Sequence, residues 1–302
     1  GRRPRRLPLS GANDFAAGFA GTLNQFSDGL PNTKGRLKKQ LNRNMNLIRT
    51  VGAKTLGFIQ ALGSVCLFLL QILAHSGTSL LRFRLSVRQV YFAGVLSVLI
   101  IAVSGLFVGM VLGLQGYTQL AKFKSADILG YMVAASLLRE LGPVLAAILF
   151  ASSAGGAMTS EIGLMKATEQ LEAMNVMAVN PVARVVAPRF WAGVFSMPLL
   201  ASIFNVAGIY GAYLVGVQWL GLDGGIFWSQ MQNNISFGYD VLNGLIKSAF
   251  FGVAVTLIAV HQGFHALPTS EGILRASTRT VVSSALVVLA IDFILTAFMF
   301  TG

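Results

Sequence analysis

The sequence predicts an all-α membrane protein with five transmembrane helices. Hydrophobic residues make up 54% of the 302 residues and charged residues only 11%, against about 25% charged in a typical globular chain. A chain so poor in charge cannot cover a surface that faces water, but lipid can cover an apolar one. Five apolar segments of about 20 residues or more are each long enough to cross roughly 30 Å of hydrocarbon.

The first element, residues 1–43, is a basic tail that we expect to be mostly disordered. It contains nine Lys/Arg and two Asp and is rich in Gly, Pro and Asn, a composition that buries too little apolar surface to fold. Much of the net charge of +12 lies here, because the rest of the chain holds 14 Lys/Arg against nine Asp/Glu. The tail lacks zinc and helix-turn-helix signatures and aromatic–basic interleaving, so we expect no nucleic acid partner.

Residues 44–88 predict an N-terminal interfacial, or elbow, helix followed by a basic connector. The apolar stretch 58–74 is interrupted by Gln60, Ser64 and Gln71, and it falls just short of the roughly 18 residues that a span requires. We therefore expect it to lie in or dip into the membrane interface. The alternative is that it crosses the bilayer. The connector that follows contains Arg82, Arg84 and Arg88.

The membrane domain is expected over residues 89–302. Its candidate spans are residues 90–117, 128–150, 191–217, 241–260 and 281–300. Lys and Arg in short connections concentrate on the cytoplasmic side of a membrane protein. Nineteen lie in the N-terminal region and in the connections 151–190 and 261–280, against only Lys122 and Lys124 on the other side. This asymmetry predicts a cytoplasmic N-terminus and an external C-terminus.

Four ionisable residues lie inside these spans: Arg139, Glu140, Lys247 and Asp292. A charge at the bilayer centre costs about 2.5–3.5 kcal/mol on insertion scales, so we expect each to have a partner or a functional role. Asp292 lies about 11 residues from the cytoplasmic end of its span, and Lys247 lies about six residues from the outer end of its own. The difference in depth is small enough for long side chains to bridge. We predict that these two side chains pair, either as a structural ion pair or as part of a transport pathway.

The first span contains two overlapping GxxxG steps, Gly105, Gly109 and Gly113. Small residues four apart create a flat helix face that a second backbone can approach closely. That second backbone belongs either to the same subunit or to a dimer partner, and the same face can instead line a lipid path. For the dimer or lipid alternative, the candidate residues also include Leu112, Tyr117 and Leu120.

The connection 151–189 is expected to be a cytoplasmic coupling segment. It contains a short amphipathic helix in which Leu171, Met174 and Met177 recur every three residues beside Glu169 and Glu172. Such a helix can insert into a groove on a soluble partner. The alternative is that its apolar stripe lies on its own helical bundle.

Several segments together resemble the MlaE/YrbE permease family. They are GLFVGMVLGLQGY (105–117), SLLRELGPVLAAILFASSAGGAMTSEIG (136–163), GLMKATEQLEAMNVMAVNPVARVVAPR (163–189), LPTSEGILRASTRTVV (267–282) and IDFILTAFMF (291–300). The resemblance extends from about residue 47 to the C-terminus and covers all five spans. The 43-residue tail departs from the usual short N-terminus of the family.

The resemblance implies the permease half of an ABC transporter that moves phospholipids in the inner membrane of Gram-negative bacteria and maintains the lipid asymmetry of the outer membrane. It implies a homodimer that works with a cytoplasmic ATPase, a STAS-like regulatory subunit, a periplasmic MCE-domain ring and a soluble periplasmic lipid carrier. It also implies that the coupling segment docks into the ATPase. The residues concerned are Glu169, Gln170, Leu171, Glu172 and Met174.

We expect no catalytic, cofactor or metal site in this chain. The sequence lacks the GxxxxGK[ST] loop that holds the phosphates of ATP, so ATP and Mg would be bound by the partner ATPase. Cys66 is the single cysteine, and no third ligand is evident near His261 and His265.

Two other classes of function compete with the ABC permease. One is a proton-coupled secondary transporter that uses Glu140 and Asp292, but no internal repeat supports it. The other is an intramembrane aspartyl protease that uses Asp240 and Asp292. Two carboxylates that share a proton must meet at one depth, and the sequence places Asp240 at the outer edge of the membrane with Asp292 near its middle.

Overall fold

The computed structural model describes residue 60 and the ranges 63–74 and 83–300. The chain divides into two units, Gly1–Ser64 and Val65–Gly302, and the helical bundle belongs to the second. The expected tail 1–43 and most of the segment 44–88 lie outside the described residues. Within the described ranges the protein is helical and contains no strand, which agrees with the predicted all-α class.

In the part of the chain that the structure describes, five helical segments are long and apolar enough to cross a membrane: Ser97–Lys122, Ala126–Ala167, Val182–Trp219, Phe237–Phe264 and Ser270–Met299. The five predicted spans lie within or largely within these segments. A shorter apolar helix, Gly63–Ala74, forms the end of the expected interfacial stretch. Its Phe68 and Ile72 are buried against residues of the third and fourth spans, among them Phe190 and Val260.

The first two spans differ in regularity. The first belongs to α4 (Phe83–Lys122), an uninterrupted helix of 40 residues. The second is built from α5 (Leu129–Ser136), α6 (Gly142–Phe150) and α7 (Gly156–Ala167), which two π-helical turns join, η2 (Leu137–Leu141) and η3 (Ala151–Gly155). Residues 151–167 therefore continue the second span. The segment that was expected to begin at 151 as a connection is helical as far as Ala167 and leaves the bundle only near Thr168.

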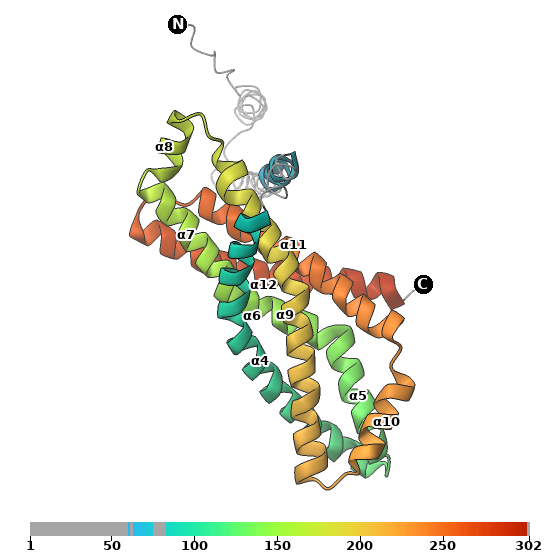
Figure 1. Ribbon diagram of the computed structural model, residues 1–302. Helices are drawn as coiled ribbons and strands as arrows, with labels where there is room; N and C mark the ends of the chain where they lie inside the picture. The colour runs from blue at the N-terminus through green and yellow to red at the C-terminus, as the bar shows by residue number, and fades with distance from the viewer. Residues whose placement is uncertain (1–59, 61–62, 75–82, 301–302) are drawn as a thin grey trace, which may run out of the picture. The chain divides into compact units, whose positions relative to one another are not determined.

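The rest of the bundle consists of α8 to α12. After α8 (Gln170–Val176), the third span comprises η4 (Val182–Val186), α9 (Ala187–Tyr213) and η5 (Leu214–Trp219). A short helix, α10 (Gly224–Asn234), precedes η6 (Phe237–Val241) and α11 (Leu242–Phe264) of the fourth span, and α12 (Ser270–Phe300) forms the fifth. Figure 1 shows α8 and α10 at opposite ends of the bundle.

The core lies mainly between α6, α9 and α11. Large side chains such as Phe150, Phe204 and Phe251 are fully buried there. By contrast, α12 shows most of its apolar side chains at the surface, including Phe293 and Phe298. Such a distribution is typical of membrane helices, in which lipid rather than water meets the exposed apolar side chains.

Packing of the glycine face

The three glycines of the first span pack inside the subunit. A Cβ built on Gly105 would lie 2.7 Å from the backbone oxygen of Phe204, and one built on Gly113 would lie 3.0 Å from the Cα of Ala212. Between them, Gly109 lies so close to the backbone of Gly208 that a side chain on Gly109 would have no room. The α4 and α9 helices thus form a seam of backbone contact, as small residues four apart allow.

This packing corrects one of the two interpretations of the GxxxG steps. Gly105, Gly109 and Gly113 are covered by α9 of the same chain, so we remove them from the candidate dimer face and lipid path. Leu112, Tyr117 and Leu120 are half-buried and pack against the core. Leu112 also lines a cavity of about 530 Å³ between α4 and α5.

Candidate functional site

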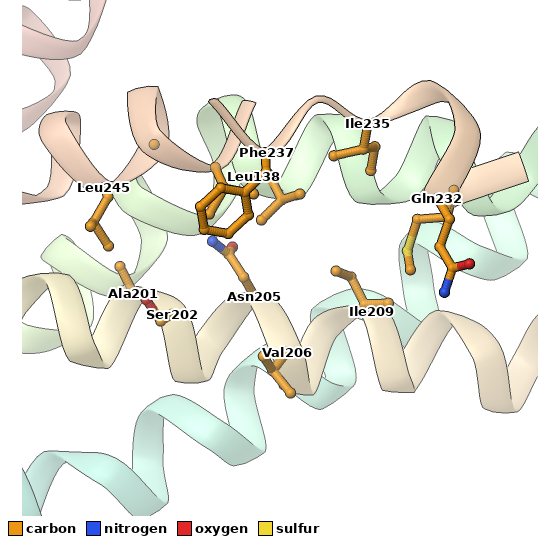
Figure 2. Close-up of a pocket in the computed structure, with 13 residues that line it drawn as sticks. Leu138, Ala201, Ser202, Asn205, Val206, Ile209, Gln232, Ile235, Phe237 and Leu245 are labelled. Atoms are coloured by element: carbon orange, nitrogen blue, oxygen red, sulfur yellow. The ribbon is translucent and has the colours of Figure 1, made fainter. Parts of the chain in front are cut away.

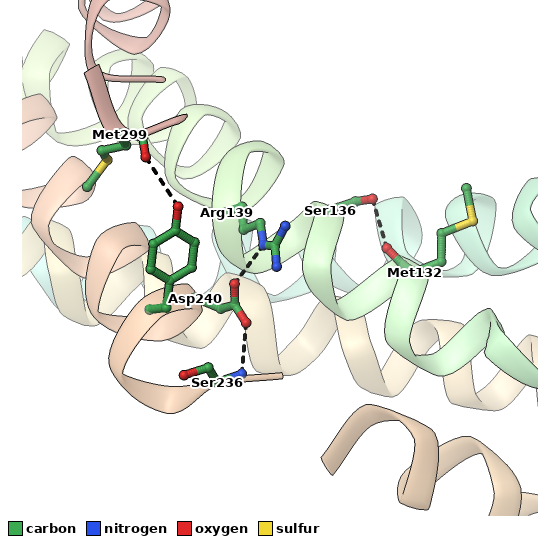
Figure 3. Close-up of polar contacts among 7 residues, drawn as sticks. Met132, Ser136, Arg139, Ser236, Asp240 and Met299 are labelled. Atoms are coloured by element: carbon green, nitrogen blue, oxygen red, sulfur yellow. Dashed lines mark hydrogen bonds and ion pairs between the residues drawn. The ribbon is translucent and has the colours of Figure 1, made fainter. Parts of the chain in front are cut away.

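Among the described residues, two ion pairs have a member whose side chain is only 1% exposed, and the first of them joins Arg139 to Asp240. The Arg139 Nε donates a hydrogen bond of 2.6 Å to Asp240 Oδ1, and the backbone N–H of Ser236 donates one of 2.8 Å to Oδ2 (Figure 3). The Asp240 side chain is 1% exposed and the Arg139 side chain 30%. The buried carboxylate therefore has a donor on each oxygen, which is what an ionised group needs away from water.

Both members of this pair lie in π-helical turns, Arg139 in η2 and Asp240 in η6. Pro143 supplies a physical reason for η2, because proline has no N–H to offer the carbonyl of Arg139 four residues before it. The N–H of Gly142 instead bonds the carbonyl of Leu137, five residues back. The extra residue in the turn changes the direction in which its side chains leave the helix, and such turns are frequent at functional sites.

The second ion pair joins Lys247 of α11 to Asp292 of α12, as the sequence predicted. The Lys247 Nζ lies 3.3 Å from Asp292 Oδ1 and donates a hydrogen bond of 2.7 Å to the hydroxyl of Thr296. Here the cation is the buried member, because Lys247 is 1% exposed and Asp292 is 20% exposed. Asp292 and Thr296 are four residues apart on one helix, so both face Lys247.

The fourth predicted charge, Glu140, is exposed, and no ion pair involves it among the described residues. It is the neighbour of Arg139 but leaves the helix on a different side. The two carboxylates of the protease alternative are held by different cations, Asp240 by Arg139 and Asp292 by Lys247. The structure therefore does not bring Asp240 and Asp292 together as a catalytic dyad.

The amphipathic helix expected in the coupling segment is observed as α8, but two of the three residues of its apolar stripe face inward. Leu171 is buried and Met174 is half-buried, and both pack with Ile162 and Val185 of neighbouring elements. We therefore remove Leu171 and Met174 from the surface that a partner would contact. The surface itself is formed by exposed residues at and after the start of α8. These residues are Glu169, Gln170, Glu172, Val176 and Met177.

An apolar groove of about 440 Å³ lies between α9, α10 and the start of the fourth span (Figure 2). We call it the α9 groove. Two of its walls come from the π-helical turns that carry the first ion pair, through Leu138 of η2 and through Phe237 and Val241 of η6. Its volume falls within the range of about 300–1,000 Å³ that is usual for ligand pockets. The remaining lining residues are Ala201, Ser202, Asn205, Val206, Ile209, Met231, Gln232, Ile235, Gly244 and Leu245.

Comparison with known proteins identifies the family. The family model described as "Permease MlaE" matches residues 86–298. The chain is 56% identical over 256 residues to the "Intermembrane phospholipid transport system permease protein MlaE" of Haemophilus influenzae, an alignment that covers 85% of this chain and 98% of that protein. The chain belongs to the MlaE permease family. It is therefore a multi-pass membrane permease.

Less similar relatives also align over most of the chain. A "Probable ABC transporter permease protein" of Rickettsia felis is 32% identical over 256 residues, covering 85% of this chain and 98% of that one. One from Synechocystis is 30% identical over 232 residues, covering 77% and 88%. The chain thus spans nearly the whole length of the first two relatives and most of the third.

Sequence reasoning missed Asp240 as the partner of Arg139. It assumed that every span starts at one membrane surface, which placed Asp240 at the edge and Arg139 well inside the membrane. In this MlaE-family structure α10 packs along α5, with the backbone of Phe227 against Gly130. The fourth span consequently begins beside η2. The sequence did contain a signal for this pair, because Arg139 and Asp240 are opposite charges to which the sequence interpretation had assigned no partner.

Proposed function

We propose that this protein is the transmembrane subunit of an ABC transporter that moves phospholipids between the inner membrane of a Gram-negative bacterium and a soluble periplasmic carrier, and so maintains outer-membrane lipid asymmetry. The observation that carries the proposal is the 56% identity to the Haemophilus influenzae permease over 98% of its length. Its printed name describes intermembrane phospholipid transport. The ion pairs and the α9 groove within the spans are consistent with a path for an amphipathic substrate.

The proposal includes an orientation. The Lys/Arg asymmetry favours a cytoplasmic N-terminus and a periplasmic C-terminus. With this orientation the α8 end of the bundle is cytoplasmic and the α10 end is periplasmic. An ATPase would then dock at α8, and the MCE-domain ring would meet the α10 end. A STAS-like subunit and a second copy of the permease complete the proposed assembly.

Charge reversal at Glu169 tests the docking surface. Glu169 is exposed and begins α8 with a left-handed backbone, φ 58°. We expect Glu169→Lys to abolish lipid-stimulated ATP hydrolysis in reconstituted vesicles without unfolding the permease, because a reversed charge in a complementary interface costs several kcal/mol. Glu169→Asp is the matched control, because it keeps the negative charge at the same exposed position. An unchanged rate in Glu169→Lys would contradict the docking assignment.

Co-purification tests the assembly as a whole. We expect the full-length chain, isolated from its native membrane under mild conditions, to bring an ATPase with it. After the partner is stripped away, the chain alone should not hydrolyse ATP, because its sequence lacks a phosphate-binding loop. Hydrolysis that a partner-free preparation retains would contradict the proposal.

A further inference from the structure

The α9 groove is elongated along its helix. Ala201, Asn205 and Ile209 follow one another along α9 at four-residue steps and form one wall, a length of about 12 Å at about 1.5 Å per residue. Figure 2 shows Leu245 near one end of this wall and Gln232 near the other. A long, narrow apolar space parallel to a transmembrane helix has the form of a straight hydrocarbon chain.

A polar group lies within this apolar space. Asn205 is 8% exposed, and its Oδ1 is buried and has no hydrogen-bond partner among the described residues. Figure 2 shows its amide pointing from α9 across the groove toward Leu138 and Phe237. The backbone at Gly142 approaches the amide so closely that a side chain at 142 would collide with it. The Oδ1 therefore faces this backbone rather than the open groove, and the amide nitrogen is the polar atom of Asn205 that is left to meet a polar group of a ligand there.

The rim of the groove indicates where that ligand comes from. Val206 is 69% exposed, Phe237 77% and Leu245 39%, and all three lie in membrane-spanning segments. Apolar side chains exposed at this position face the hydrocarbon of the bilayer. The molecules that reach the groove laterally are therefore membrane lipids rather than solutes from water.

We propose that the α9 groove takes one acyl chain of a glycerophospholipid directly from the bilayer, with the polar glycerol region against Asn205. The Asn205 amide can donate a hydrogen bond to an ester carbonyl of the lipid through Nδ2. The inference rests on the proposed function and extends it, because it assigns a lateral site at the α10 end where phospholipid passes between the bilayer and the permease.

Photochemical cross-linking tests this site. A benzophenone amino acid is placed at Val206 in cells grown with radioactive phosphate, and the full-length protein is purified in detergent with its co-purifying subunits and irradiated. The matched control position is Leu199, which lies two turns away on α9, is 62% exposed and does not line the groove. We expect a phosphate-labelled lipid adduct at 206 and severalfold less at 199, because detergent removes lipid that is only loosely associated.

Two variants test the contacts that define the site. Ser202→Trp would fill the groove from an exposed rim position and should remove the adduct at 206. Asn205→Leu keeps the side-chain volume but removes the polar group, and it should weaken the adduct severalfold. Both variants should leave the thermal unfolding midpoint within the range of the control, so that a loss of adduct reports binding rather than folding.

Each contrary outcome overturns the inference in a recognisable way. Equal labelling at 206 and 199 would show a non-specific lipid shell, and a protein–protein adduct at 206 would show that a second copy of the chain covers the groove. Labelling that survives Asn205→Leu unchanged would remove Asn205 from the site. Absence of the adduct from a complex that still transports phospholipid would reject this site and leave the proposed function intact. If the unmodified complex does not transport phospholipid, the proposed function itself is rejected.

Discussion

The Arg139–Asp240 and Lys247–Asp292 ion pairs differ in which charge is buried. In the first, the anion is buried, because Asp240 is 1% exposed while Arg139 is 30% exposed. In the second, the cation is buried, because Lys247 is 1% exposed while Asp292 is 20% exposed. In each pair the more exposed residue compensates the charge of the buried one. The consequences of losing a residue therefore depend less on its own burial than on the partner that it leaves behind.

The largest effect is expected for Arg139→Ala. It strands the carboxylate of Asp240, which keeps only the N–H of Ser236. Breaking a buried pair typically costs about 3–5 kcal/mol, and we expect a loss of this size in thermal and denaturant unfolding of the purified protein. Asp240→Ala should cost less, because the guanidinium of Arg139 can turn toward solvent or headgroups. An equal or larger loss for Asp240→Ala would contradict the view that the stranded partner determines the cost.

A somewhat smaller effect is expected for Asp292→Ala. It strands the ammonium of Lys247, but the Thr296 hydroxyl remains as an acceptor, so the loss should fall near the lower end of about 3–5 kcal/mol. Replacing both residues, Lys247→Ala with Asp292→Ala, should recover much of the stability. Additive effects of the two single changes would show that the residues do not interact.

The same double variant separates structure from transport. We expect the Lys247–Asp292 pair also to hold a headgroup or to gate the transport path, because charges inside membrane spans mark such pathways. The stable double variant should then fail to restore the outer-membrane barrier to detergent in a complementation assay. Full complementation would assign the pair a structural role alone. The assay therefore tests whether the Lys247–Asp292 pair has a role beyond stabilising the bundle.

The next effect concerns the second donor to Asp240. Ser236 has φ −87° and ψ 118°, and the preceding Ile235 is extended, so Ser236→Pro fits the backbone while it removes the N–H that bonds Oδ2. A hydrogen bond to a charged group contributes about 1.5–3 kcal/mol, and we expect a loss in the upper part of this range. Ser236→Ala keeps the N–H and is the control that should leave the unfolding midpoint unchanged.

The smallest effect is expected for Thr296→Val, which preserves shape and removes the acceptor from Lys247. Because Asp292 still compensates the ammonium, the loss should be near the lower end of about 1.5–3 kcal/mol. Combining Thr296→Val with Asp292→Ala should cost more than the sum of the separate changes, since no acceptor then remains for Lys247 among the described residues. A purely additive result would contradict the shared role of the two acceptors.

The two pairs also show how far sequence reasoning reaches. Lys247 and Asp292 lie on uninterrupted stretches of α11 and α12, where counting residues along a regular helix gives the correct relative depth. Arg139 lies in a π-helical turn well inside the second span, whereas Asp240 lies in one at the start of the fourth. The same count fails there, because neither the extra residue of a π-helical turn nor the packing of α10 along α5 has a periodic signature in the sequence.

Elements were predicted more reliably than the partners of their faces. Apolar length alone predicted the five spans, and the acidic residues and apolar stripe of α8 predicted an amphipathic helix. The GxxxG steps indicated a close backbone contact but could not say with which helix, and the stripe of α8 could not say whether Leu171 faces a partner or its own bundle. These choices depend on tertiary packing, which a local pattern does not contain.

The seam of glycines between α4 and α9 has a consequence for motion. Because backbone touches backbone along Gly105, Gly109 and Gly113, sliding or twisting one helix against the other would drive main-chain atoms into each other. Packed interfaces of this kind change by discrete steps rather than by continuous deformation. The α4 and α9 helices should therefore travel as one rigid body during a transport cycle, and the hinges must lie elsewhere. The π-helical turns inside the second span, at the two ends of the third and at the start of the fourth are the natural places for the chain to bend.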